Sequence, residues 1–294
     1  MKRRTLLYLT IAVVLAVCVA AVFAACRDRA PEKPVLAVSI EPQRYLLERI
    51  AGNKFDVVSL LSANADPELY DPSVSNLLLL QKSRIYFRVG TIGFEQASLA
   101  KISENCPDLK IVDTSAGIKR AEGTHGGPHG YDPHIWTSVR NARVMARNMY
   151  DAVVVADPKN KCYYHRQWRT LDRDLASLDT TLSALLKPYR GSSFVIKHPS
   201  LTYFARDYGL EQIPLEINGK EPSPRDMKMR MDLIKKSGPV TFFLESGHAA
   251  APQRSLASEL GIPTAEISLL QYDWKQNILS VADAIAAGAA AKAQ

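Results

Sequence analysis

Short apolar runs alternate with amphipathic stretches along most of this chain, and no other feature constrains its fold as strongly. The apolar runs have the length of buried strands, and the stretches between them have the length of helices. Strands and helices in such alternation are typical of parallel sheets in an α/β fold. In the first half, strands are predicted at residues 35–39, 55–61, 85–89 and 109–112, with helices at 43–50, 75–82 and 94–105.

The same alternation returns in the second half of the chain. Ser223 precedes Pro224 and an acid stands at Asp226, which predicts a capped helix that starts at the proline. Strands are predicted at residues 193–196, 212–216, 240–244 and 264–267. Two series of this kind indicate two α/β lobes, each with a mainly parallel sheet flanked by helices.

The sequence between the two series predicts helices. One candidate covers residues 141–156, and a second runs from residue 160 to about 186 without an internal Pro or Gly. At 1.5 Å per residue, the second helix would be roughly 40 Å long. Flexible linkers are rich in Gly and Ser, so we expect a long rigid helix to join the lobes. The expected organisation is an N-terminal lobe at 35–157, a linking helix at 158–187 and a C-terminal lobe at 188–294.

The N-terminus carries the pattern of an export signal. Lys2, Arg3 and Arg4 precede an apolar run from Leu6 to Ala25, as the charged n-region precedes the apolar h-region of a signal peptide. A run of about 20 residues could also span a bilayer, so an uncleaved anchor is the alternative.

The residues around Cys26 favour a lipoprotein signal peptide at 1–25. The sequence Phe-Ala-Ala at 23–25, followed by Cys26, resembles the lipobox of bacterial lipoproteins, in which the cysteine becomes lipidated and N-terminal. Residues 26–34 are mostly polar and contain Pro, as expected for a tether. We therefore expect a protein exported to the periplasm or the cell surface and anchored to the membrane by lipid.

The charge balance argues against a nucleic-acid partner. The chain has 37 Lys and Arg against 30 Asp and Glu, a formal net charge of +7. Three of the basic residues and no acid lie in residues 1–25, so the remainder has 34 basic residues against 30 acidic ones. A nucleic-acid binder would carry its positive charge in patches on the folded body.

If the chain is cleaved before Cys26 and Cys26 carries lipid, the remaining cysteines are Cys106 and Cys162. An exported pair could form one disulfide, and the alternative is two buried free thiols. The sequence does not show whether their Cα atoms approach within bonding range, so both alternatives stay open. No C-x-x-C occurs, which disfavours a thioredoxin-like or zinc-ribbon role.

Histidines at segment junctions are the residues best suited to chemistry. The chain has no G-x-G-x-x-G, G-x-x-x-x-G-K-[ST], H-E-x-x-H or G-x-S-x-G, the usual signatures of nucleotide binding, metalloproteases and esterases. His198 and His248 follow predicted strands, where ligands of α/β sheets gather, and His134 lies in a loop. Neutral imidazole is a favoured ligand of zinc and similar metals, so a metal site is a hypothesis. His165, in the long helix, is expected to be structural.

Several motifs in sequence order resemble those of a known family. The matching segments are residues 38–42 (VSIEP), 66–73 (DPELYDPS), 132–136 (DPHIW), 198–209 (HPSLTYFARDYG), 221–224 (EPSP) and 243–245 (FLE). On these motifs, the chain from Val35 to about Ala287 resembles the metal-binding solute receptors of bacterial zinc and manganese ABC importers, the cluster A-I (cluster 9) class. The resemblance implies a metal site in the cleft between the two lobes.

The resemblance also implies metal ligands at particular positions. His134 and His198 match the positions of the second and third ligands. Glu68 stands where the zinc-binding members usually carry the histidine of the first loop. A carboxylate oxygen binds zinc at about 2.0–2.2 Å and also suits manganese, so Glu68 is expected to ligate.

The fourth ligand and one family loop depart from the pattern. Ser268 stands where an Asp often supplies the fourth ligand, so His248, Glu245 and a water are the candidates. The family's long loop, rich in His and acids, is reduced here to His125 and His129 in a Gly-rich segment. These two histidines are either solvated or an auxiliary site of metal capture.

The function that the resemblance implies is capture of a divalent metal outside the cytoplasm, with Zn²⁺ as the first choice and Mn²⁺ or Fe²⁺ as alternatives. The metal would pass to an ABC permease with a cytoplasmic ATPase, because this chain has no phosphate-binding loop. We expect a monomer that is not an enzyme. Two other classes are weaker alternatives, a zinc hydrolase with Glu245 as its general base and a surface adhesin.

Overall fold

The computed structural model describes residues 33–63, 65, 67–68, 70–122, 130–217, 220–245 and 250–292, together with 14, 15 and 17. The chain divides into two units, Met1–Pro34 and Val35–Gln294. In the first unit, Val14, Leu15 and Val17 are helical and exposed. The predicted lipidation site, Cys26, lies outside the described residues. No helix among those described is long and apolar enough to cross a bilayer.

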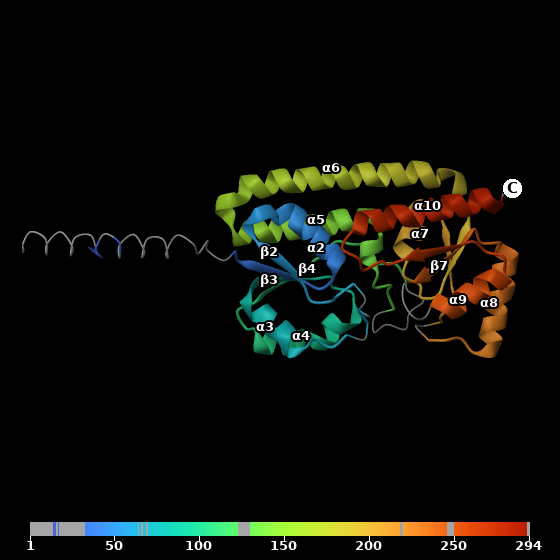
Figure 1. Ribbon diagram of the computed structural model, residues 1–294, viewed down its shortest axis with the longest axis horizontal. Coiled ribbons are helices and arrows are strands. Elements are labelled where there is room, and N and C mark those ends of the chain that lie inside the picture. Colours follow the sequence, from blue (N-terminus) through green and yellow to red (C-terminus); the bar gives the residue numbers. More distant parts are fainter. Residues whose placement is uncertain are drawn as a thin grey trace, which may run out of the picture. The chain divides into compact units, whose positions relative to one another are not determined.

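The first sheet of the described chain is parallel and four-stranded. Its strands pair in the order β2-β1-β3-β4. The strands are β1 (Val35–Val38), β2 (Asp56–Ser59), β3 (Ser83–Arg88) and β4 (Lys110–Asp113). Three helices follow from the same alternation: α2 (Glu41–Ala51), α3 (Val74–Lys82) and α4 (Gly93–Asn105). Figure 1 shows α2 on one face of this sheet and α3 and α4 on the other.

The second sheet repeats the topology of the first within the described residues. Its parallel strands pair in the order β6-β5-β7-β8. The strands are β5 (Ser193–Ile196), β6 (Glu211–Pro214), β7 (Thr241–Glu245) and β8 (Thr264–Ile267). Its helices are α7 (Thr202–Tyr208), α8 (Pro224–Ser237), α9 (Ala250–Glu259) and α10 (Trp274–Lys292). The predicted two-lobed α/β fold is therefore confirmed.

Two helices lie between the two sheets in the sequence, α5 (Val139–Ala156) and α6 (Lys161–Leu186). Buried leucines recur along α6 every three or four residues, from Leu171 to Leu186, and give this helix one apolar stripe. With that stripe α6 packs against α2 and α5 near the first sheet and against α7 and α10 near the second. Figure 1 shows α6 extending along both lobes, so the predicted rigid linking helix is confirmed. Short 3-10 helices lie at Gly52–Lys54, Ile135–Thr137, Pro158–Asn160 and Lys187–Tyr189.

The hydrophobic core is continuous between the lobes. One cluster of buried side chains contains Leu36 of β1 as well as Phe194 and Phe243 of the second sheet. Val195, between Phe194 and Ile196, belongs to a smaller cluster on the opposite face, under α8 and α9. Because residues Val35–Gln294 form one compact unit, the exact lobe boundaries stay predictions.

The candidate disulfide is not formed, because both cysteines in the described residues are free. Cys106 is buried after the end of α4, and its Sγ lies 3.8 Å from the Leu77 carbonyl oxygen as a weak donor. Cys162 is exposed in the first turn of α6. One thiol is thus enclosed in the first lobe while the other faces solvent.

Candidate metal centre

Glu68 lies in the loop between β2 and α3, and the start of α4 fixes the main chain of that loop. The Phe94 N–H donates to the Pro67 carbonyl at 3.4 Å. Gly93 lies so close to Glu68 that a Cβ at this position would be 3.2 Å from the Glu68 carbonyl oxygen. The side chain of Glu68 is 35% exposed, so its carboxylate is accessible from solvent.

The start of α4 is in turn fixed by Glu95, which is fully buried. Its carboxylate accepts hydrogen bonds from the main-chain N–H groups of Val89 at 2.6 Å and Gly90 at 2.7 Å, and from the Ser39 hydroxyl. Burial raises the pKa of the Glu95 carboxyl to about 7, against the hydrogen bonds that lower it. Glu95 therefore supports the segment that positions Glu68.

His134 is almost completely buried, with 4% of its surface exposed. Its Nδ1 lies 3.0 Å from Asp132 Oδ1, and the same oxygen accepts the His134 main-chain N–H at 2.8 Å. Burial acts to raise the pKa of Asp132, but the charge and hydrogen bonds of His134 outweigh it, so this pKa lies below its usual value. A histidine whose Nδ1 donates to a carboxylate keeps Nε2 as the metal-binding atom.

His198 follows β5 and is bounded by two carboxylates. Its Nδ1 lies 2.9 Å from Glu216 Oε2, and its Nε2 lies 3.7 Å from Glu68 Oε1. Burial lowers the pKa of His198, but the hydrogen bond to Glu216 and the charges of Glu245 and Glu68 raise it further than burial lowers it. The hydrogen bond to His198 lowers the pKa of Glu216.

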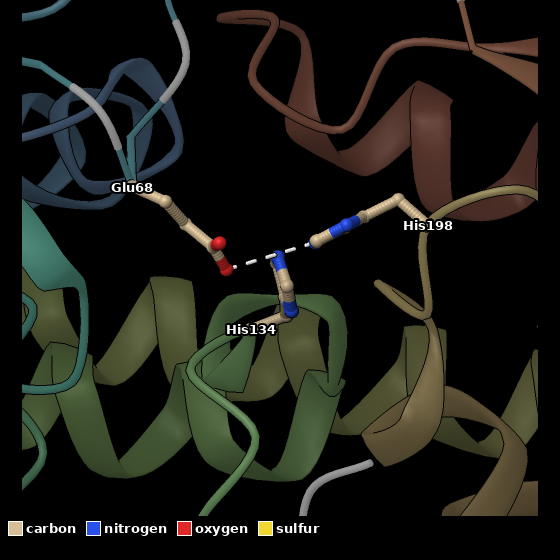
Figure 2. Close-up of side chains that lie close together, drawn as sticks. All are labelled: Glu68, His134 and His198. Carbon is tan, nitrogen blue, oxygen red and sulfur yellow. Dashed lines mark ion pairs between the residues drawn. The ribbon is translucent and has the colours of Figure 1, made fainter. Parts of the chain in front are cut away.

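Glu68, His134 and His198 form a cluster in which one ligand atom of each lies within 4.8 Å of the others. Figure 2 shows the three side chains converging from separate segments of the chain. The imidazole rings of His134 and His198 have centroids 5.1 Å apart and an interplanar angle of 77°. Ligands at about 2.0–2.2 Å from one tetrahedral zinc lie about 3.4 Å apart, so small side-chain movements would close this set on an ion.

The segment that carries His134 is hydrogen-bonded to the second lobe. The Tyr203 hydroxyl, from α7, donates to the Asp132 carbonyl at 2.8 Å. The Trp136 indole donates to the Leu269 carbonyl at 3.1 Å, and the Trp274 indole of α10 donates to the Trp136 carbonyl at 2.7 Å. These bonds hold His134 in a fixed position relative to His198.

The other residues considered from the sequence are not members of this cluster. Glu245 ends β7 and is largely buried, which raises the pKa of its carboxyl, and its Oε1 accepts from the Ser200 hydroxyl at 3.3 Å. Ser268 directly follows β8 and offers a hydroxyl instead of a carboxylate. His165 lies on α6 with its Nδ1 3.3 Å from the Tyr150 hydroxyl, as expected for a structural residue.

Three predicted candidates lie outside the described residues: His125, His129 and His248. Sequence reasoning missed Asp132 and Glu216, the two carboxylates that lie against the Nδ1 atoms of the histidines. Asp132 stands two residues before His134, a short spacing that could have indicated the contact. Glu216 stands 18 residues after His198 and carries no comparable local signal.

Comparisons with known proteins give a consistent result. The sequence model of the family described as ZnuA, zinc-uptake complex component A, periplasmic, matches residues 36–287. The high-affinity zinc uptake system protein ZnuA of Bacillus subtilis (strain 168) is 24% identical over 257 residues, which cover 83% of this chain and 81% of that protein.

Solved structures resemble the fold closely. A crystal structure of ZnuA superposes with a TM-score of 0.81 and 32% identity, covering 87% of this chain and 99% of the other. A crystal structure of a 138-173 ZnuA deletion mutant with zinc bound gives a TM-score of 0.80 and 33% identity, covering 87% of this chain and 97% of the other.

Proposed function

The chain belongs to the ZnuA family of periplasmic zinc-uptake components, and we propose that it binds the metal through Glu68, His134 and His198. The observation that carries the proposal is the convergence of these three side chains, one carboxylate and two imidazoles within 4.8 Å. Two neutral imidazoles and one carboxylate form a ligand set that suits zinc. The fourth position would be filled by His248, by Glu245 or by water.

Zinc is the preferred metal in this proposal and manganese is the alternative. Imidazole ligands favour zinc, whereas carboxylate and water ligands suit manganese, so the balance depends on Glu68. The zinc-bound ZnuA neighbour and the zinc uptake protein of B. subtilis support zinc. The hydrolase alternative is not favoured, because the matching family model and the similar curated protein are zinc-uptake components.

The physiological role that follows is reversible capture without turnover. The metal would then pass to a membrane permease driven by an ATPase. We further propose that lipid at Cys26 holds the protein at the membrane. A Cys26→Ser variant is then expected in the soluble fraction or as an unprocessed precursor. Membrane association that still requires detergent for release in this variant would point to an uncleaved apolar anchor instead.

The ligand set can be tested by calorimetric titration of zinc and manganese into metal-stripped protein. Glu68→Ala should weaken zinc binding by well over tenfold, which is more than about 1.4 kcal/mol. Asp71→Ala is the matched control, because Asp71 lies in the same loop and is 84% exposed. Its zinc affinity should equal that of the wild type. Glu68→His should retain zinc and bind manganese less well.

Two results would contradict the proposal. Wild-type protein that binds neither metal would contradict the assigned function. Equal zinc affinity in the wild type and Glu68→Ala would show that Glu68 is not a ligand. The missing ligand would then have to be sought at His248, at Glu245 or in the loop with His125 and His129.

A further inference from the structure

Glu216 has a position fixed by the second sheet, although it lies beyond the end of β6. In the parallel pairing of β5 with β6, Ile196 is aligned with Pro214. The hydrogen bonds continue past the strands, from the Leu215 N–H to the Ile196 carbonyl at 2.9 Å and from the Glu216 N–H to the Lys197 carbonyl at 3.0 Å. The same register places Glu216 beside His198.

The carboxylate of Glu216 is fixed at both oxygens. Oε2 lies 2.9 Å from His198 Nδ1, and Oε1 lies 3.7 Å from Lys197 Nζ. The side chain is only 14% exposed, so the hydrogen bond to His198 is shielded from competing water. Lys197 also contacts Glu221 Oε1 at 3.1 Å, which restrains the ammonium group.

This contact determines which nitrogen of His198 is available. A carboxylate accepts hydrogen bonds and donates none when ionised, so the proton of a neutral His198 must reside on Nδ1. The lone pair then lies on Nε2, the atom that faces Glu68 at 3.7 Å. A carboxylate in contact with a ligating histidine fixes its tautomer and ring orientation and makes it a more basic ligand.

We propose that Glu216 is a positioning residue for metal capture, one that holds His198 with Nε2 directed at the ion. This inference rests on the proposed function, because it assumes that His198 is a ligand. His134 has an equivalent carboxylate in Asp132. The difference is that Asp132 belongs to the same loop as its histidine, whereas Glu216 comes from the neighbouring strand connection. The orientation of His198 therefore depends on the pairing of β5 with β6.

The test compares Glu216→Ala and Glu216→Gln with a Glu221→Gln control. Gln at 216 keeps an oxygen that accepts the Nδ1 proton but removes the charge, whereas Ala removes both. Glu221 contacts the same Lys197 and is 81% exposed, so its variant changes the charge near Lys197 without altering the bond to His198. The zinc dissociation constant is measured by competition with a chromophoric chelator. The tautomer of His198 is read in the metal-free proteins from long-range ¹H–¹⁵N NMR correlations.

We expect Glu216→Ala to weaken zinc binding 10- to 100-fold, the range found for such supporting residues, and Glu216→Gln to fall between it and the wild type. The zinc dissociation constant of the Glu221→Gln control should stay within about twofold of the wild-type value, because exposed charges contribute little. In NMR spectra His198 should carry its proton on Nδ1 in the wild type and in Glu216→Gln, and as a mixture on both nitrogens in Glu216→Ala. If Glu216 only stabilised the fold, its replacement would leave the His198 proton on Nδ1.

Two outcomes would overturn the inference, and they are distinguishable. If the wild type binds zinc and both Glu216 variants bind it equally well, Glu216 does not position the ligand and the proposed function stands. If the wild type binds no zinc, the proposed function fails and the inference fails with it. Should Glu216→Ala fail to fold, the isosteric Glu216→Gln still decides, because an affinity equal to that of the wild type together with protonation on Nε2 would contradict the proposal.

Discussion

The buried carboxyl of Glu95 should make the stability of the metal-free protein depend on pH near neutrality. The folded protein raises the pKa of this group from 4.5 to about 7 because the side chain is buried. The neutral form can be satisfied in place, since a protonated Glu95 can donate to the Ser39 hydroxyl while its oxygens accept from Val89 and Gly90. The folded state thus holds a proton that the unfolded state releases.

The sign and size of the effect follow from the two pKa values. Below about pH 4.5 both states are protonated, and Glu95 costs no stability. As the pH rises toward 7, the unfolded chain ionises while the folded protein does not, so stability is lost. Above about pH 7 both states are ionised and the loss levels off. Between pH 5 and pH 8 the free energy of unfolding should fall by about 2 to 3 kcal/mol through this group alone.

Urea unfolding of metal-stripped wild type and Glu95→Gln at pH 5, 6, 7 and 8 measures this contribution. The other titrating groups are the same in both proteins and cancel in the difference. Gln supplies one oxygen for two main-chain N–H groups, which costs about 1–3 kcal/mol at every pH. The difference in unfolding free energy between the wild type and Glu95→Gln should therefore shrink steadily from pH 5 to pH 8. An advantage that stays constant within about 0.5 kcal/mol would refute the reasoning, since measured unfolding energies would resolve a larger change.

Three further perturbations have defined outcomes. Tyr203→Phe removes a hydroxyl that donates to the Asp132 carbonyl and accepts the Ala121 N–H, so urea unfolding should show a loss of about 1–3 kcal/mol; an unchanged midpoint would show that these bonds contribute nothing. Gly288→Ala would gain about 1 kcal/mol in an exposed helix, but here its Cβ would lie 2.1 Å from the Val240 carbonyl, so the melting temperature should fall, and a rise would contradict this packing. Free zinc at 100 times its Kd should stabilise the wild type by about 2.7 kcal/mol, reversibly with chelator, whereas an unaffected melting temperature would argue against specific binding to the folded state.

The fold was predictable from the sequence because it depends on local patterns. Each predicted strand and each helix of the first lobe lies within two residues of the observed element, since buried parallel strands are short apolar runs bounded by polar residues. The start of α8 followed from a cap, and the Ser223 hydroxyl does accept the Asp226 N–H at 3.2 Å. Such signals involve residues a few positions apart, so one sequence contains all of the required information.

The site was predictable only in part, because its members meet through tertiary structure. His198 could be nominated from its place after a strand, but the same argument nominated His248 equally well. Glu68 entered only through resemblance to a family, and its role as a ligand stays a prediction. Glu216 could not be found, because its contact with His198 depends on the register of two paired strands. The hydrophobic pattern indicates which face of a sheet a residue lies on, but it does not specify which residues of two strands are paired.

The hydrogen bonds between the lobes also determine which substitutions the junction can tolerate. Their acceptors are main-chain carbonyls, those of Asp132, Trp136 and Leu269, whereas their donors are the side chains of Tyr203, Trp136 and Trp274. Every residue carries a carbonyl group, so Leu269 can be exchanged for many residues without loss of its bond to the Trp136 indole. No such freedom exists on the donor side, where only a few side chains reach as far with a hydroxyl or an N–H. Among related sequences, the acceptor position 269 should therefore be substituted often, whereas the donor positions of Tyr203 and Trp274 should rarely change.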